Sequence, residues 1–235
     1  MKIEIWSDFV CPFCYIGKRR LEQAIERYPE NISVHIEYKS FELDPNAPTY
    51  QGTGIHESLA KKYGMSIEQA KQANAQIREQ ARSVGLEFVF DTMKPTNTFD
   101  VHRVAKYAKE MGVEATFTEE MLHQYFSKSK NLSDQETLTT ISENIGLDPH
   151  QVETILRDSN LYANNVRADE AEAQNLGITG VPFFVINQKY AISGAQPTET
   201  FLQAIERVHE EEKDGLQDLT PTTDADYCDG DHCYR

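Results

Sequence analysis

The chain has 235 residues, 39% of them hydrophobic, and its 23 lysines and arginines against 38 aspartates and glutamates give a formal charge of −15. This length and composition are typical of one or two globular domains and exclude a fibrous or disordered chain. The negative charge argues against a nucleic acid or an anionic membrane as partner, because either would repel the protein. No apolar run is long enough for a membrane-spanning helix.

The N-terminal residues predict a strand and not a secretion signal. Polar and apolar residues alternate from Lys2 to Asp8, with Ile3 and Ile5 on one side and Glu4 on the other. This alternation leaves no room for the apolar stretch of a signal peptide. We therefore expect a cytoplasmic protein, in a reducing compartment where close cysteine pairs indicate redox chemistry or metal binding more often than structural disulfides.

A Cys-Pro-Phe-Cys motif, from Cys11 to Cys14, lies between this strand and a predicted helix that ends before Pro29. The position predicts Cys11 as the N-cap residue and Pro12 as the first helical residue, where a missing N–H costs nothing. Free N–H groups and the helix dipole stabilise a thiolate there, so we expect Cys11 to be the nucleophile. We expect Cys14, one turn further on, to be more buried, to stay protonated and to act as the resolving thiol.

Further strands and a last helix complete an α/β pattern. Alternation over residues 32–40 predicts a second strand, and two short strands within 177–187 and 190–195 precede a helix over 198–212. Strand, helix, strand and later strand, strand, helix is the order of the thioredoxin fold. Pro182 opens an apolar strand, which predicts either a sheet edge or a cis peptide bond, because proline cannot donate to a sheet.

The middle of the chain is helical in character. Capping residues mark four predicted helix starts, at Ser66, Thr116, Ser133 and Asp148. A further helix over 162–176 leads back to the sheet. We therefore predict a discontinuous thioredoxin-like domain, residues 1–44 and 161–209, interrupted by a large all-helical insertion over 45–160 that walls one side of the Cys11 cleft.

Three separated motifs give the chain its resemblance to a known family. They are Asp8 to Gly17, Asn97 to Arg103, and Gly177 to Val185 followed by Gly194-Ala195-Gln196. Together they resemble the FrnE-like branch of the DsbA oxidoreductases over almost the whole chain. The resemblance implies thiol–disulfide exchange with protein or small-molecule disulfides and dithiols, without a cofactor.

The resemblance also implies roles for residues around the cysteine pair. A cis Val181–Pro182 bond would face Cys11, and the Val181 backbone would pair with an extended substrate. Pro12 and Phe13 would contact the substrate as well. Because neither Pro12 nor Phe13 offers a cation to the Cys11 thiolate, we expect a reductase or isomerase, served by a cellular thiol reductant, and not a net oxidant.

Two polar residues near the motif have open roles. Asp8 could relay protons to Cys14 through water, or it could cap the turn after the strand. His102 lies in the Asn97–Arg103 motif, where we expect a structural role.

The C-terminal residues 210–235 form an acidic segment that ends in Cys228 and Cys233. This Cys-x4-Cys is similar to one in some FrnE-like proteins. We predict a mobile tail whose thiol pair exchanges with Cys11 or Cys14, favoured by effective concentration. The alternative is an inert surface pair.

Other classes of function compete with thiol–disulfide exchange. Cys11 and Cys14 could form half of a zinc site completed by Cys228, Cys233 or His232, although we expect no metal. A glutathione-dependent transferase or isomerase of the kappa type would use the same fold, but those relatives carry serine in place of Cys11. A client-binding module or holdase would use the apolar cleft around Phe13 and Phe183.

Overall fold

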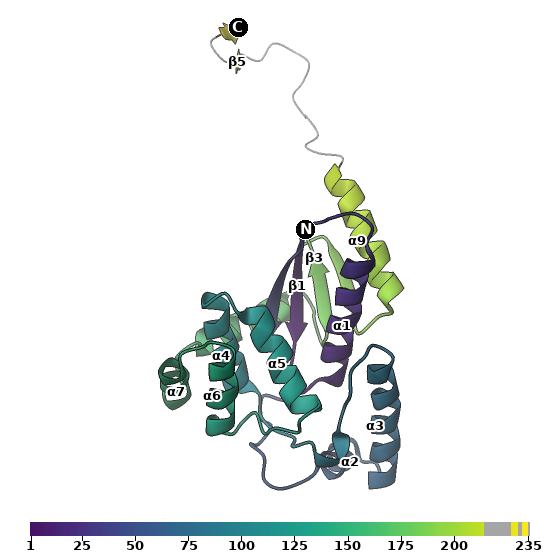
Figure 1. The fold of residues 1–235 in the computed structure, drawn as a ribbon, viewed down its shortest axis with the longest axis vertical. Coiled ribbons are helices and arrows are strands. Elements are labelled where there is room, and N and C mark those ends of the chain that lie inside the picture. The colour runs from purple at the N-terminus through teal and green to yellow at the C-terminus, as the bar shows by residue number, and fades with distance from the viewer. Residues whose placement is uncertain (214–226, 230–231, 235) are drawn as a thin grey trace.

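The computed structural model describes residues 1–213, and the backbone of 227–229 and 232–234. Its central sheet has the strand order β2-β1-β3-β4, with β1 and β2 parallel and the other pairs antiparallel. The bounds are β1 Lys2–Ser7, β2 His35–Ser40, β3 Phe183–Ile186 and β4 Tyr190–Ser193. This sheet confirms the predicted α/β, thioredoxin-like fold (Figure 1).

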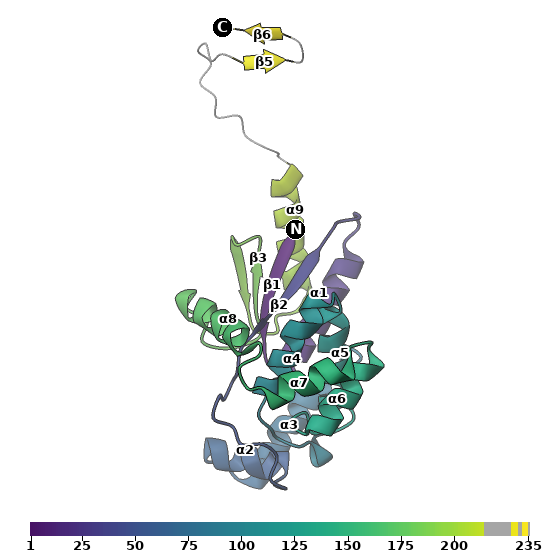
Figure 2. The ribbon, with the colours of Figure 1, turned by 90° about the vertical axis from the view of Figure 1, so that its left-hand side faces the viewer.

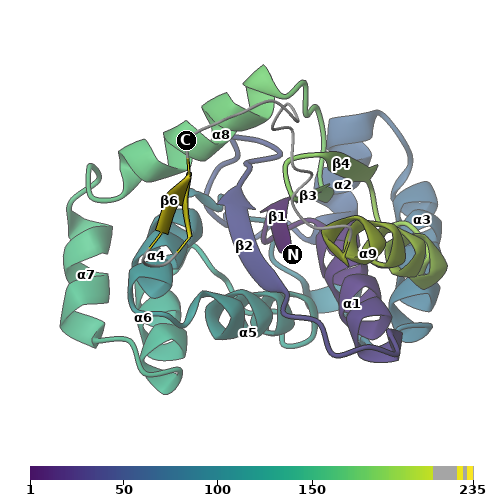
Figure 3. The ribbon, with the colours of Figure 1, turned by 90° about the horizontal axis from the view of Figure 1, so that it is seen from above.

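Helices α1 (Pro12–Arg27) and α9 (Thr198–Lys213) cover one face of the sheet (Figure 3). Ile3 and Ile5 of β1 point into this layer and pack in one buried cluster with residues of both helices, including Leu21 and Phe201. The alternation in β1 therefore places its isoleucines on the predicted common face.

The opposite face of β1 is also buried, although it carries a charge. Trp6 packs towards α8 (Ala163–Asn175) and its Nε1–H donates to the backbone oxygen of Asp169 at 3.0 Å. Glu4, only 4% exposed, accepts a hydrogen bond from Lys2 at 2.9 Å. The Asp169 carboxylate pairs with Lys106 and accepts the Ser40 N–H at 2.7 Å. This side of the sheet is thus held by paired charges, which offset the cost of burying them.

Between residues 45 and 160 the regular elements are all helices, joined by non-helical stretches that include 45–54, 83–89 and 93–98. The helices are α2 Ile55–Tyr63, α3 Ile67–Arg82, the short η1 Phe90–Thr92, α4 Phe99–Glu110, α5 Glu114–Phe126, α6 Gln135–Asn144 and α7 Pro149–Arg157. Helices α4 to α7 gather on one side of the sheet, while α2 and α3 lie below the carboxyl end of β1 (Figure 2).

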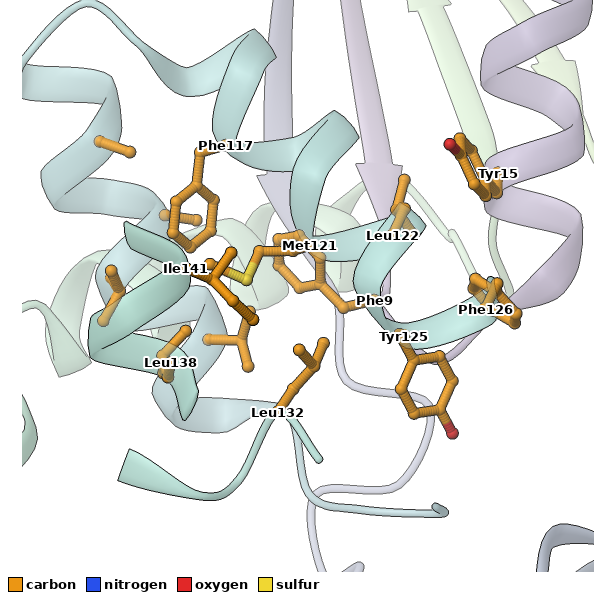
Figure 4. Packing of buried hydrophobic residues seen from close by; sticks show 14 of the residues in the cluster. Phe9, Tyr15, Phe117, Met121, Leu122, Tyr125, Phe126, Leu132, Leu138 and Ile141 are labelled. Carbon is orange, nitrogen blue, oxygen red and sulfur yellow. The ribbon is translucent and has the colours of Figure 1, made fainter. Parts of the chain in front are cut away.

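One continuous apolar core joins these helices to the thioredoxin-like part. Phe9, just after β1, and Tyr15 of α1 lie in the same buried cluster as Met121 and Phe126 of α5 (Figure 4). The rings of Phe88 and Phe126 stack with their centroids 4.6 Å apart. The ring of Tyr15 stacks on Phe88 with a centroid distance of 5.9 Å. The residues that flank the cysteine motif are therefore packed against α5 and Phe88.

Two of the predicted helix starts are confirmed directly. Ser66 forms a reciprocal capping box with Gln69, and Asp148 caps α7. The prediction for Ser133 is wrong by one residue, because the adjacent Asp134 caps α6 by accepting the N–H of Thr137 at 2.9 Å. An aspartate carboxylate also carries the charge that a helix N-terminus favours.

Helix α9 ends at Lys213. It therefore continues past residue 209, the predicted end of the thioredoxin-like domain. Strands β5 (Tyr227–Asp229) and β6 (His232–Tyr234) form an antiparallel hairpin, and its register pairs Cys228 with Cys233. In the part of the chain that the structure describes, no helix has the length and apolar character needed to cross a membrane.

Candidate active site

Cys11 lies at the N-cap of α1, with extended backbone angles (φ −89°, ψ 111°), and Pro12 begins the helix, as predicted. The Cys11 N–H donates to the Asp8 carbonyl at 3.1 Å, and the Cys14 N–H donates to the Cys11 carbonyl at 3.1 Å. Both cysteines are free thiols. The turn between β1 and α1 thus fixes Cys11 at the N-terminus of α1, which is the positive end of the helix dipole.

The fold brings Pro182 to this turn although it lies far along the sequence. The Val181–Pro182 bond is cis, and the Cys11 thiol lies 3.6 Å from the Val181 carbonyl oxygen. Of the two explanations offered for Pro182, the edge position is wrong, because the strand that follows it, β3, lies between β1 and β4.

The two active-site thiols are buried to nearly the same extent, and the pKa of Cys14 is raised. Cys14 is 3% exposed and Cys11 4%, so Cys14 is not appreciably more buried, contrary to expectation. Burial raises the pKa of Cys14 well above its ordinary value, and its hydrogen bond with Cys11 raises it further. A hydrogen bond from the Ser7 side chain opposes these effects without reversing them. Cys14 therefore remains a neutral thiol that faces Cys11.

Asp8 connects three segments around the cysteine turn. Its side chain is 1% exposed, and its Oδ2 accepts the Leu43 N–H at 2.8 Å. Its Oδ1 lies 3.3 Å from Nε2 of His102, whose ring also packs on Phe9 with centroids 4.9 Å apart. The Asp8 carboxylate thus holds the loop that contains Leu43 and the helix α4 beside the cysteine turn.

Sequence reasoning missed this Asp8–His102 pair and the position of Leu43. The signal was present in the Asn97–Arg103 motif, which carries His102 on α4, but nothing local to that motif identifies Asp8 as its partner. Leu43 is 45% exposed and Phe13 is 37% exposed. Phe13, within the cysteine motif, and Leu43, whose N–H binds Asp8, are therefore accessible apolar side chains.

A cluster of charges ties α1 to α5 one turn after Cys14. Glu119 accepts hydrogen bonds from the Tyr15 hydroxyl and from Arg19, each at 2.6 Å, and pairs with Lys18. Burial alone would raise the pKa of Glu119, but the hydrogen bonds from Lys18 and Tyr15 outweigh it and lower the pKa. The predicted capping box of Thr116 with Glu119 is therefore wrong: α5 starts earlier, at Glu114.

Among the residues whose side chains the structure describes, no group of three or more His, Cys, Asp or Glu could hold a metal ion. The side chains of Cys228, His232 and Cys233 lie outside that description. The zinc and tail-exchange interpretations of these residues stay predictions.

A cysteine pair at the start of α1, facing a cis-proline segment on a four-stranded sheet, places the protein among thioredoxin-fold oxidoreductases. Residues 2–206 match the DSBA-like thioredoxin domain family. The match covers most of the chain, and the protein belongs to this family.

Solved structures extend this finding. The probable DsbA oxidoreductase SCO1869 from Streptomyces coelicolor is 38% identical and has a TM-score of 0.86, with 100% of this chain and 99% of that chain covered. A 2-hydroxychromene-2-carboxylate isomerase is 16% identical with a TM-score of 0.71 and coverage of 92% and 100%. The cytosolic disulfide reductase DsbM from Pseudomonas aeruginosa, solved with GSH, is 13% identical with a TM-score of 0.61 and coverage of 89% and 100%. The last two likenesses concern the fold alone.

Proposed function

We propose that the protein is a thiol–disulfide oxidoreductase of the FrnE-like branch, with Cys11 as nucleophile and Cys14 as resolving thiol. One observation carries the proposal: the Cys11 thiol lies at the N-terminus of α1, 3.6 Å from the Val181 carbonyl oxygen, with the protonated Cys14 behind it. Pro12, Phe13 and Val181 would contact the substrate around this sulfur.

The exchange proceeds in two displacements. The Cys11 thiolate attacks a client disulfide, one client sulfur leaves as a thiolate, and a mixed disulfide forms. Cys14 then loses its proton and attacks the Cys11 sulfur, which releases the second client thiolate. The client gains two electrons, and the enzyme is left with a Cys11–Cys14 disulfide.

Reduction or isomerisation is the direction we favour, in the cytoplasm, with a cellular thiol to restore the Cys11–Cys14 dithiol. Neither Pro12 nor Phe13 supplies a cation that would make the reduced form exceptionally stable. The likeness to a cytosolic disulfide reductase solved with GSH makes glutathione the first reductant to test.

A trapping experiment tests the proposal. Cys14→Ser should leave a client covalently attached to Cys11, whereas Cys11→Ser should trap nothing, and the wild-type protein should reduce insulin disulfides with glutathione as reductant. Conjugation of glutathione to a small electrophile that survives Cys14→Ser, without insulin reduction, would favour the kappa-type enzyme instead. Suppression of aggregation that persists after alkylation of both thiols would favour the holdase.

We further propose that Cys228 and Cys233 form an auxiliary redox pair. The support is the β5–β6 register, which places the two residues directly opposite each other, as the backbone of a cross-strand pair requires. Cys228→Ser with Cys233→Ser should then slow turnover with a large thiol reductant while leaving single-turnover reaction at Cys11 unchanged. Equal turnover would identify the tail pair as inert.

A further inference from the structure

Release of the client requires a base for Cys14. Burial and the hydrogen bond to Cys11 keep Cys14 protonated, yet only its thiolate can attack the mixed disulfide. The Ser7 side chain, at the end of β1, forms a hydrogen bond with Cys14 that lowers the pKa of this thiol. A serine hydroxyl can pass a proton on, but it is too weakly basic to keep one.

Ser7 also lines a small cavity between the sheet and helices α4 and α5. The cavity measures about 20 Å³, which is room for about one water molecule. Its walls include Ser7, His102 of α4 and Thr118 of α5. Thr118 is 2% exposed, and its hydroxyl oxygen has no hydrogen-bond partner among the protein atoms. A buried hydroxyl without a protein partner, on a residue that lines a cavity of this size, could bind one water molecule there.

His102 supplies the imidazole among the residues that line this cavity, and imidazole is the side chain most often used as a general base. Its Nε2 lies 3.3 Å from Oδ1 of Asp8, and in the tautomer that donates Nε2–H to this carboxylate, Nδ1 is the basic nitrogen. Asp8 and the Phe9 ring hold the imidazole in place. In many enzymes a carboxylate orients a histidine that acts as the base for a nearby hydroxyl or thiol group.

We propose that His102 is the general base that takes the Cys14 proton, through Ser7 and one water molecule in this cavity, and that Asp8 positions its imidazole. The inference rests on the proposed function and adds the base of its second step. The proton moves from Cys14 to Ser7, from Ser7 to the water and from the water to His102. The Cys14 sulfur then bonds to the Cys11 sulfur as the client sulfur leaves, and the His102 proton passes to solvent.

Several charged groups surround this imidazole and set the charge balance of the step. They are Asp8 after β1, Lys39 on β2, Glu42 in the following loop, Lys106 on α4 and Glu114 on α5. These groups carry charges of both signs. Protonation of His102 therefore adds a positive charge beside carboxylates that compensate it.

The test separates the two displacements with an aromatic disulfide, 5,5′-dithiobis(2-nitrobenzoate), whose two chromophoric thiolates leave one after the other. The first release reports attack by Cys11, and the second reports attack by Cys14. His102→Gln should slow the second release about 100-fold near pH 7 and leave the first unchanged. The defect should shrink as pH rises, because hydroxide then replaces the base. His150→Gln, at an exposed position on α7, is the matched control.

Ser7→Ala provides a second test that leaves the histidine in place. It should slow the second release alone, with the same recovery at high pH. An unchanged second release at every pH in both variants, or an equal slowing of both releases, would overturn the role of His102. A wild-type protein that releases no second thiolate would instead overturn the proposed function itself.

Discussion

Gly17 of α1 lies against the ring of Pro182: a Cβ on Gly17 would lie 3.1 Å from Cγ of Pro182 and 3.1 Å from Cζ of Phe184. Carbon atoms rarely pack that closely, and Phe184 is fully buried. The helix that carries both cysteines therefore approaches the Val181–Pro182 segment as closely as a residue without a side chain permits.

Gly17→Ala should slow thiol–disulfide exchange several-fold. The added methyl group pushes Pro182 away by a few tenths of an ångström and so changes the 3.6 Å contact between the Cys11 thiol and the Val181 carbonyl. Alanine also gains up to about 1 kcal/mol in a helix, so the melting temperature should change little while the rate falls. Both quantities are measurable on the same sample, by insulin reduction and by thermal unfolding.

Gly180→Ala is the matched control for that variant. Gly180 precedes Val181, and a Cβ there would meet no atom within 4 Å. Wild-type rates for Gly17→Ala, or a larger defect in Gly180→Ala, would contradict the importance of the close approach.

Glu119→Gln should destabilise the protein by about 1–2 kcal/mol. The change removes the charge that pairs with Lys18, which is only 6% exposed, and weakens the bonds from Arg19 and Tyr15. Urea unfolding at neutral pH measures the loss. Glu120→Gln is the control, because Glu120 accepts a hydrogen bond from Gln124 of its own helix. Equal stability of the two variants would show that the α1–α5 charge cluster contributes nothing.

The contrast between Ser66 and Glu119 shows what the sequence can predict. A capping box depends on four consecutive residues, and the one at Ser66 forms as its local pattern indicates. The pattern at Thr116 is equally good, yet Glu119 binds α1, about a hundred residues away, because burial of Lys18 demands a partner. Local patterns therefore fix strands and helix starts, whereas pairs of buried polar groups depend on packing.

The features of the candidate site also fall into those that neighbouring residues predict and those that depend on contacts between distant segments. The N-cap position of Cys11 follows from a strand, a Pro12 and a helix that are adjacent in sequence. The Asp8–His102 pair and the Leu43 contact join segments 94 and 35 residues apart. No alternation or spacing encodes such pairs, and only the resemblance indicated that Pro182 would meet Cys11.

Glu37 gives a pH-dependent contribution to stability. Burial alone would raise its pKa, but hydrogen bonds from Lys109 and Lys2 outweigh burial and lower the pKa to about 2. A carboxyl whose pKa is lower in the folded state stabilises the protein above its ordinary pKa, and this contribution is lost as pH falls from about 4.5 towards 2.

Glu37→Gln should therefore be less stable than the wild type near neutral pH, and the difference should narrow on acidification. Both lysines are about 40% exposed, so solvent screening limits the effect to about 1 kcal/mol. Urea unfolding across this pH range measures it, with the exposed Glu143→Gln on α6 as control. A difference that widens in acid would refute the assignment.

Limited alkylation should distinguish the two active-site thiols. Iodoacetamide reacts with thiolates, and burial with the hydrogen bond to Cys11 keeps Cys14 protonated. Near neutral pH, substoichiometric reagent should therefore modify Cys11 at least about tenfold faster than Cys14, as read by mass spectrometry of the reduced protein's peptides. Cys11→Ser should leave Cys14 slow to react, because its burial persists without its partner. Rapid alkylation of Cys14 in either protein would reverse the assignment of nucleophile and resolving thiol.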